Sequence, residues 1–154
     1  KYVILDADSL NSFQKKTKKF LKYLDKNKLI TPHRAEFHRL FPSIKTSLSN
    51  KEKVSKFLKV CKSNILLKGN TTVIGSPAKI VINKHTSSEL AVIGSGDVLA
   101  GIIASLVGDK KMSPNEAASA ATWIHGDIAK RYGRGLISED LVKGIPSALQ
   151  RLKK

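Results

Sequence analysis

Short apolar runs alternate with amphipathic segments along the first third of the chain. The run 3-VILDAD-8 is apolar and β-branched ahead of its acids, which predicts a short buried strand. Residues 12–25 place large apolar side chains among lysines, a pattern typical of an amphipathic surface helix. A further short helix is expected after 31-TPH-33, where Pro32 disfavours a helical conformation at the preceding residue.

The rest of the chain predicts one more helix, three strands and then three helices. Ser49 and Glu52 have the spacing of a capping box, which begins a helix that runs to about Lys62. The strand candidates, joined by GN and SPA turns, are residues 65–68, 71–75 and 79–83. The last three helices are expected over 97–107, from a cap at Ser113 to about Tyr132, and from a cap at Ser138 to about Leu152.

This alternation of strands and helices favours an α/β fold with a mostly parallel central sheet. In such folds, ligands bind outside the carboxyl ends of the strands. The sequence contains no internal repeat and no linker, so residues 1–154 are expected to form a single domain.

Length and composition indicate a globular chain. A folded chain of this size buries roughly 68–70% of its unfolded surface, and 41% of the residues are hydrophobic against 26% charged. No apolar stretch reaches the ~20 residues of a membrane span, so no membrane partner is expected. The single cysteine, Cys61, allows no internal disulfide, which suits a cytoplasmic protein. The chain starts without Met inside a predicted strand, as expected of a part of a longer protein.

The net charge of +16 raises the possibility of a nucleic-acid partner. It arises from 28 Lys and Arg against 12 acids, enough to attract nucleic acid without sequence preference. The lysines are nevertheless spread through the predicted helices, and aromatic residues make up only 6% of the chain. Without an aromatic stacking platform, we expect a solvated lysine-rich surface and no specific nucleic-acid partner.

The stretch 94-GSGD-97 carries the first candidate chemistry. Gly94 and Gly96 allow a sharp bend and close approach to a ligand, and the unpaired N–H groups of the following helix can hold an anion. Asp97 would then lie beside that anion, where it could take a proton from a substrate hydroxyl. The alternative is that Ser95 or Asp97 merely caps the helix.

Other enzyme motifs are excluded. A nucleophile elbow would need glycine where Ile93 and Asp97 flank Ser95. The sequence has neither a Walker A loop nor a HExxH zinc motif.

Four motifs together resemble a known family. The segments are 3-VILDADSLN-11, 31-TPHRAEFHRLF-41, 66-LLKGNTTVI-74 and 94-GSGDVLAGIIASL-106, in the order and spacing of the ADP/ATP-dependent NAD(P)H-hydrate dehydratases. These enzymes belong to the ribokinase-like superfamily, which implies a three-layer α/β/α fold. The chain is similar to the C-terminal part of their domain.

The resemblance implies a lyase that repairs reduced nicotinamide cofactors. Family members use ADP or ATP to phosphorylate the hydroxyl of hydrated NADH or NADPH, and loss of the phosphate then regenerates the cofactor. ADP is the donor we expect here. Mg²⁺ is expected with the nucleotide because the chemistry is phosphoryl transfer.

The same resemblance assigns roles to individual residues. His33 corresponds to a substrate-binding histidine, and Asp97 to the catalytic base, which also contacts the substrate. Asp8 and Asn11 would contact substrate or magnesium, or equally cap the helix that follows. The expected nucleotide-binding residues are Lys68, Gly69, Asn70, Thr71, Thr72, Gly94, Ser95 and Gly96.

The sequence also departs from the family. The segment 84-KHTSSELAVIGSGD-97 lacks the family's Gly-Asn-Pro turn, and the N-terminal part of the fold has no counterpart. We therefore expect a second chain that supplies that part, or a homo-oligomer, to cover an open sheet edge. Two alternatives remain: a small-molecule kinase of the same superfamily, such as a hydroxymethylpyrimidine kinase, and an inactive remnant with a basic interaction surface.

Overall fold

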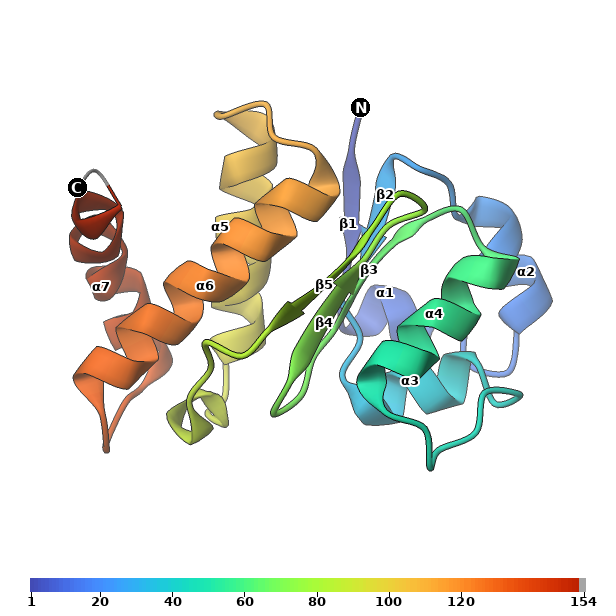
Figure 1. Ribbon diagram of the computed structural model, residues 1–154, viewed down its shortest axis with the longest axis horizontal. Coiled ribbons are helices and arrows are strands. Elements are labelled where there is room, and N and C mark those ends of the chain that lie inside the picture. The colour runs from blue at the N-terminus through green and yellow to red at the C-terminus, as the bar shows by residue number, and fades with distance from the viewer. Residues whose placement is uncertain (153–154) are drawn as a thin grey trace.

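A five-stranded sheet forms the centre of the molecule (Figure 1). The computed structural model describes residues 1–152. The strands lie side by side in the order in which they occur along the chain. They are β1 (Val3–Leu5), β2 (Lys28–Ile30), β3 (Asn64–Leu67), β4 (Thr72–Gly75) and β5 (Ile80–Asn83).

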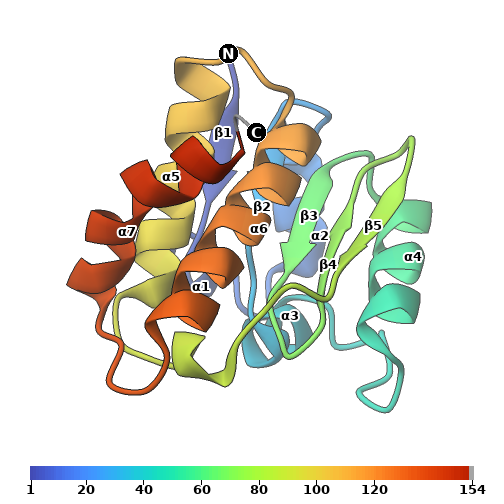
Figure 2. The same cartoon turned by 60° about the vertical axis from the view of Figure 1, so that its left-hand side comes forward.

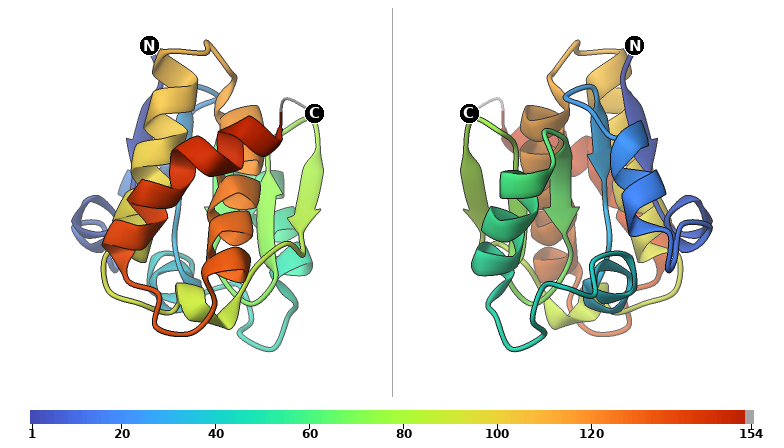
Figure 3. Two further views of the ribbon diagram at one scale, coloured as in Figure 1. Left: turned by 90° about the vertical axis from the view of Figure 1, so that its left-hand side faces the viewer. Right: turned by 90° about the vertical axis from the view of Figure 1, so that its right-hand side faces the viewer.

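Helices cover both faces of this sheet, as the three-layer prediction requires (Figures 1 and 3). One face carries α1 (Asp8–Asn11), α2 (Thr17–Tyr23), α3 (Arg34–Leu40) and α4 (Asn50–Val60). The other face carries α5 (Ser95–Gly108), α6 (Pro114–Tyr132) and α7 (Ser138–Arg151). A short 3-10 helix, η1 (Ser88–Leu90), lies in the loop between β5 and α5. No helix within residues 1–152 combines the length and the apolar character of a membrane span.

The sheet is mixed, which corrects the prediction of a mostly parallel sheet. The β1–β2 and β2–β3 pairs are parallel, whereas β4 is antiparallel to both β3 and β5. The reason is the length of the connections. Residues 68–71 and 76–79 join consecutive strands, and such short links can form only hairpins, because a parallel crossover needs a dozen or more residues.

The helix predicted over 12–25 is shorter in the structure, where only α2 occupies that range, and strand β2 was not predicted. Lys15 has a φ of 61°, in the left-handed region, which interrupts the helical conformation, so α2 begins only at Thr17. Strand β2 has only three residues and no clear local pattern. Its hydrogen bonds to strands on both sides, which are distant in sequence, define it.

Helix ends agree with the predicted caps in two of three cases. The side chains of Ser49 and Ser113 each close a capping box, with Glu52 and Glu116 respectively. The predicted cap at Ser138 is wrong, because this residue is already the first in α7. There the carboxylate of Asp140 instead accepts a hydrogen bond from the backbone N–H of Ile137 at 3.2 Å.

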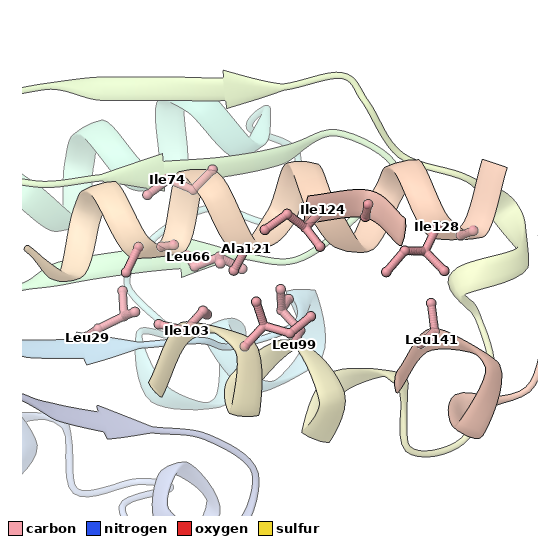
Figure 4. Packing of buried hydrophobic residues seen from close by; sticks show 14 of the residues in the cluster. Leu29, Leu66, Ile74, Leu99, Ile103, Ala121, Ile124, Ile128 and Leu141 are labelled. Atoms are coloured by element: carbon pink, nitrogen blue, oxygen red, sulfur yellow. The ribbon is translucent and has the colours of Figure 1, made fainter. Parts of the chain in front are cut away.

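The hydrophobic core on the α5–α7 face fixes the position of the α5 N-terminus. Figure 4 shows side chains from the sheet meeting those of the three helices. Alanines of α6 are fully buried and let this helix approach both α5 and the sheet closely. The labelled residues are Leu29, Leu66, Ile74, Leu99, Ile103, Ala121, Ile124, Ile128 and Leu141.

Strand β1 forms one edge of the sheet. Among the described strands it pairs only with β2, and Val3 at its start is 38% exposed. Figure 2 shows α5 beside this strand. The edge of β1 is therefore open to another strand.

Candidate functional site

A cavity of about 780 Å³ lies at the carboxyl edge of the sheet. Strands β1, β2, β3 and β5 all point toward this edge, where α/β folds bind ligands. Asp6, His33 and Lys68 follow the first three of these strands. The lining residues are His33, Arg34, Ala35, Lys68, Gly69, Asn70, Thr72, Thr86, Ser87, Ser88, Leu90, Ala91, Val92, Ser95, Gly96, Leu99, Thr122 and His125.

The N-terminus of α5 faces the end of β3 across this cavity. Gly94 occupies the N-cap position with a φ of 81°, a conformation that favours glycine. A Cβ atom on Gly96 would lie 3.5 Å from Nζ of Lys68. The free N–H groups of the first turn and the positive end of the helix dipole are therefore close to a lysine, as in an anion site.

Lys68 already has a carboxylate partner. Its Nζ lies 2.9 Å from Oδ1 of Asp6, and both side chains are mostly buried. The chain turns sharply after Asp6, because Ala7 has a φ of 46°, a conformation that costs an L-residue of order 1–3 kcal/mol. The pair links the end of β1 to the end of β3 beside the helix N-terminus.

His33 serves as the N-cap of α3. Its Nδ1 accepts hydrogen bonds from the backbone N–H groups of Ala35 and Glu36, at 3.1 and 3.3 Å. The carboxylate of Glu36 accepts from the backbone N–H of His33 at 2.8 Å and lies 3.4 Å from its Nε2. Because Nδ1 accepts, the ring proton is on Nε2, and the half-exposed ring borders the cavity.

Ser95 and His125 form a buried pair at the cavity wall. The Nε2 atom of His125 lies 3.2 Å from Oγ and 3.1 Å from the carbonyl oxygen of Ser95. The pKa of His125 is lowered to about 4, mainly by burial; the contact with the Ser95 backbone opposes this shift, and the charge of Lys68 adds to it. The imidazole is therefore neutral at neutral pH. The ring is buried within the fold.

Asp97 lies outside the lining of the cavity. Its side chain is exposed on the same face of α5 as the exposed residues Gly101, Ala104 and Gly108. The alternative that Ser95 or Asp97 caps the helix is wrong, because Gly94 is the N-cap and no side chain caps this end. Asp97 is thus on the exposed face of α5, away from the side chains that line the cavity.

The predicted nucleotide segment, residues 68–72, contributes most of its members to the cavity. Lys68, Gly69, Asn70 and Thr72 line it, whereas Thr71 does not. The Oγ1 atom of Thr72 donates to the carbonyl oxygen of Gly69 at 3.2 Å, which closes the turn.

Three further predicted residues lie outside the lining. Gly94 approaches α7, where an added Cβ would be 3.1 Å from Ser138. Asp8 and Asn11 bond to one another on α1, with 3.4 Å between Oδ1 and Nδ2. Neither has its side chain in the cavity.

The sequence did not single out the loop over 86–92 or the side chain of Arg34. The loop carries no recognisable motif, and only its packing against α6 brings it to the cavity. Arg34 stands directly after the TPH motif, which was the available signal.

No group of three or more His, Cys, Asp or Glu side chains within residues 1–152 could hold a metal ion. Asp6, which follows β1, is engaged by Lys68. The described residues therefore offer no cluster of protein ligands for Mg²⁺.

The fold is shared with solved structures of ribokinase-like proteins. A ribokinase-like superfamily protein from Enterococcus faecalis superposes with a TM-score of 0.81 at 20% identity, over 98% of this chain and 53% of that chain. The chain therefore has a ribokinase-like α/β fold. The family described as NAD(P)H-hydrate dehydratase (Carb_kinase) matches residues 1–147, and the chain belongs to this family.

Individual relatives agree with this assignment. The ADP-dependent (S)-NAD(P)H-hydrate dehydratase of Neisseria meningitidis is 37% identical over 134 residues, 84% of this chain and 45% of that protein. The ADP/ATP-dependent NAD(P)H-hydrate dehydratase of Bacillus subtilis, co-crystallised with ATP/Mg²⁺ and soaked with CoA, is 26% identical. It superposes with a TM-score of 0.79 over 97% of this chain and 56% of that chain. The chain thus spans about half the length of these relatives.

Proposed function

We propose that this chain provides the nucleotide-binding part of the active site and the catalytic base of a cytoplasmic NAD(P)H-hydrate dehydratase. The enzyme would use ADP in preference to ATP. One observation carries the proposal: the N-terminus of α5, the segment after β3 and His33 border one cavity. Membership of the NAD(P)H-hydrate dehydratase family supports the substrate. The name of the Neisseria meningitidis relative, an ADP-dependent enzyme, supports the donor.

The nucleotide would lie in the cavity with its phosphates toward the first turn of α5. There the N–H groups near Gly96 and the ammonium group of Lys68 can stabilise negative charge. The glycine at position 69 permits close approach, and the hydroxyl of Thr72 offers a further donor.

The chemistry would proceed in two steps. Asp97 takes the proton of the added hydroxyl of the substrate. The hydroxyl oxygen attacks the terminal phosphoryl group of the nucleotide, and the bond from this group to the rest of the nucleotide breaks. The substrate C–O bond then breaks, and its electrons leave with the phosphate. Loss of a ring proton restores the double bond of the reduced nicotinamide. His33, with its Nε2–H directed by Glu36, would bind the substrate.

The substrate side would need residues beyond those of this sequence. Asp97 is exposed on α5, and β1 pairs with only one neighbour among the described strands. The relatives are about twice as long as the aligned part. We propose that the part of the fold that these relatives have beyond the aligned region covers this side and completes the pocket.

Magnesium would enter with the nucleotide. The ion accompanies ATP in the co-crystals of the Bacillus subtilis relative, and Mg²⁺ is commonly held by substrate phosphates together with only one or two carboxylates. Assays should therefore contain it.

The proposal is tested by following the return of NADH absorbance from its hydrate with this chain, magnesium and either ADP or ATP. The assay is run with and without the N-terminal part of a dehydratase relative. We expect nucleotide-dependent recovery of NADH, faster with ADP. Phosphorylation of hydroxymethylpyrimidine without any recovery of NADH would contradict the proposal and identify a kinase.

A further inference from the structure

The cations around the cavity differ in whether they already have a partner. Lys68 is paired with Asp6, and burial keeps His125 neutral. Arg34 also lines the cavity, yet it takes part in none of the ion pairs found among residues 1–152. The uncompensated permanent charge at the cavity is therefore a guanidinium group.

The side chain of Arg34 is held in place by Asn50. Nε of Arg34 donates to Oδ1 of Asn50 at 3.1 Å, and Nδ2 of Asn50 donates to the carbonyl oxygen of Thr71 at 2.8 Å. Asn50 is only 4% exposed. The arginine is thus tied to the turn after β3 through Nε, which leaves its two terminal nitrogens for a ligand.

Gly69 makes this arrangement possible. An added Cβ would lie 2.9 Å from Nδ2 of Asn50 and 3.4 Å from Nε of Arg34. The absence of a side chain at this position lets the amide and the guanidinium pack against the turn. Glycine at position 69 is therefore favoured for two reasons: side chains from α3 and α4 pack against it, and it borders the cavity.

A second cation near Arg34 makes the region still more positive. The side chain of Lys53 is buried, and burial together with the charge of Arg34 lowers the pKa of its ammonium group. The pKa of His38 is lowered by its own burial and then by Lys53. Arg34 thus repels a neighbouring positive charge, and an anion bound to Arg34 would reduce this repulsion.

We infer that Arg34 binds the phosphate groups of the nucleotide and that Asn50 is the residue that positions it. The inference rests on the proposed nucleotide site and adds a residue to which the resemblance assigned no role. A guanidinium group held through one nitrogen presents two others in a fixed plane, which suits two phosphate oxygens. The ligand feature that it recognises is the diphosphate, not the base.

The test measures binding to the intact chain by calorimetry, so that it does not depend on turnover. Arg34→Gln is compared with Lys56→Gln, which removes the same charge from an exposed site on α4. We expect ADP to bind Arg34→Gln at least tenfold more weakly, the size expected for a lost charge-assisted hydrogen bond. Lys56→Gln should bind ADP as the unchanged chain does, and adenosine should bind all three alike.

A double-mutant cycle tests the positioning role. Asn50→Ala should weaken ADP binding severalfold in the chain that has Arg34, but should have no further effect on Arg34→Gln. Equal losses in both backgrounds would mean that Asn50 acts on the fold and not through the arginine. Circular dichroism of each variant checks that the secondary structure is retained.

Three outcomes would overturn the inference. Unchanged ADP affinity in Arg34→Gln would remove Arg34 from the nucleotide site and leave the proposed function intact. A loss seen only with NADH would assign Arg34 to the diphosphate of the dinucleotide. Failure of the unchanged chain to bind ADP would overturn both this inference and the proposed nucleotide site.

Discussion

At the residue scale, burial decides the charge of His125. The imidazole is 4% exposed and contacts Ser95. Its neutral form places no second positive charge beside Lys68 at the wall of the cavity. Acidification should lower the stability of the folded protein, because His125 binds a proton in the unfolded chain at a pH where it does not in the folded protein.

His125 should make the protein less stable toward low pH. Its pKa is about 4 when folded against a reference value of 6.5, so the unfolded state binds more protons between these values. The free energy of unfolding is therefore unaffected by titration of His125 above pH 6.5. It decreases as the pH falls toward 4, by roughly 3 kcal/mol in total. Urea unfolding at a series of pH values measures this slope.

His125→Asn is the matched variant for this measurement. It removes the titrating group, so its free energy of unfolding should depend less on pH over the same range. His38 has a lowered pKa as well, and its contribution remains in both proteins. Parallel slopes for the two proteins would contradict the account of His125.

Several site residues could be predicted from motifs, and others could not. His33, Lys68 and Gly96 were named from three separate motifs, and the fold brings all three to one cavity. Their roles remain predictions. Arg34 was missed because its importance depends on Asn50 and Thr71, which are far from it in sequence. Asp8 and Asn11 lie outside the cavity lining, and their role also stays a prediction.

At the scale of elements, the wall of the cavity depends on how the loop after β5 meets α6. The ring of His85 stacks on Trp123 with 5.2 Å between ring centroids. Its carbonyl oxygen lies so close to Gly126 that an added Cβ would be 1.8 Å away. The loop that lines the cavity through Thr86–Val92 therefore starts from a contact that only glycine permits.

Gly126→Ala should disturb this contact. The added methyl group must displace the backbone at His85, and overpacking of this kind costs typically 1–3 kcal/mol. We expect a lower urea midpoint and weaker ADP binding, because the loop borders the cavity. Gly101→Ala is the control, since nothing lies within 4 Å of its added Cβ. It should raise stability by about 0.5–1 kcal/mol.

If Gly126→Ala kept the stability and the ADP affinity of the unchanged chain, the proposed dependence of the cavity on this contact would be wrong. The same measurements on Gly101→Ala show how much a Gly→Ala substitution without a steric clash changes stability and ADP affinity in this protein.

Elements with strong local signals were predicted best. Ser49 and Ser113 begin their helices through capping boxes that can be read from four residues. Strand β2 and the interruption near Lys15 were missed because they depend on distant pairing and on one unusual backbone angle. The mixed sheet could have been predicted from the short connections around β4.

At the scale of the whole molecule, the net charge of +16 should cause electrostatic binding to nucleic acid without sequence specificity. Binding of a labelled DNA duplex, followed by fluorescence anisotropy, should weaken about a thousandfold or more between 50 and 200 mM salt if roughly six phosphates or more are contacted. ADP binding in the cavity should weaken far less. DNA binding that resists this salt increase would favour the inactive remnant with a basic interaction surface.

The arrangement of the whole molecule also separates the two proposed ligands. Residues of this chain, Lys68 and Gly96 among them, line the cavity, whereas Asp97 is exposed on α5 and does not line it. Nucleotide binding should therefore need only this chain. Catalysis should need the face of α5 that carries Asp97 to be covered.

The most direct test compares Asp97→Asn with the unchanged chain in the recovery of NADH from its hydrate. Both are supplied with magnesium, ADP and the N-terminal part of a dehydratase relative. The account predicts that the variant loses at least a hundredfold in rate, as expected for a missing general base, while its ADP affinity stays within a few-fold. Equal rates for the two proteins would contradict the assignment of Asp97 and, with it, the central claim.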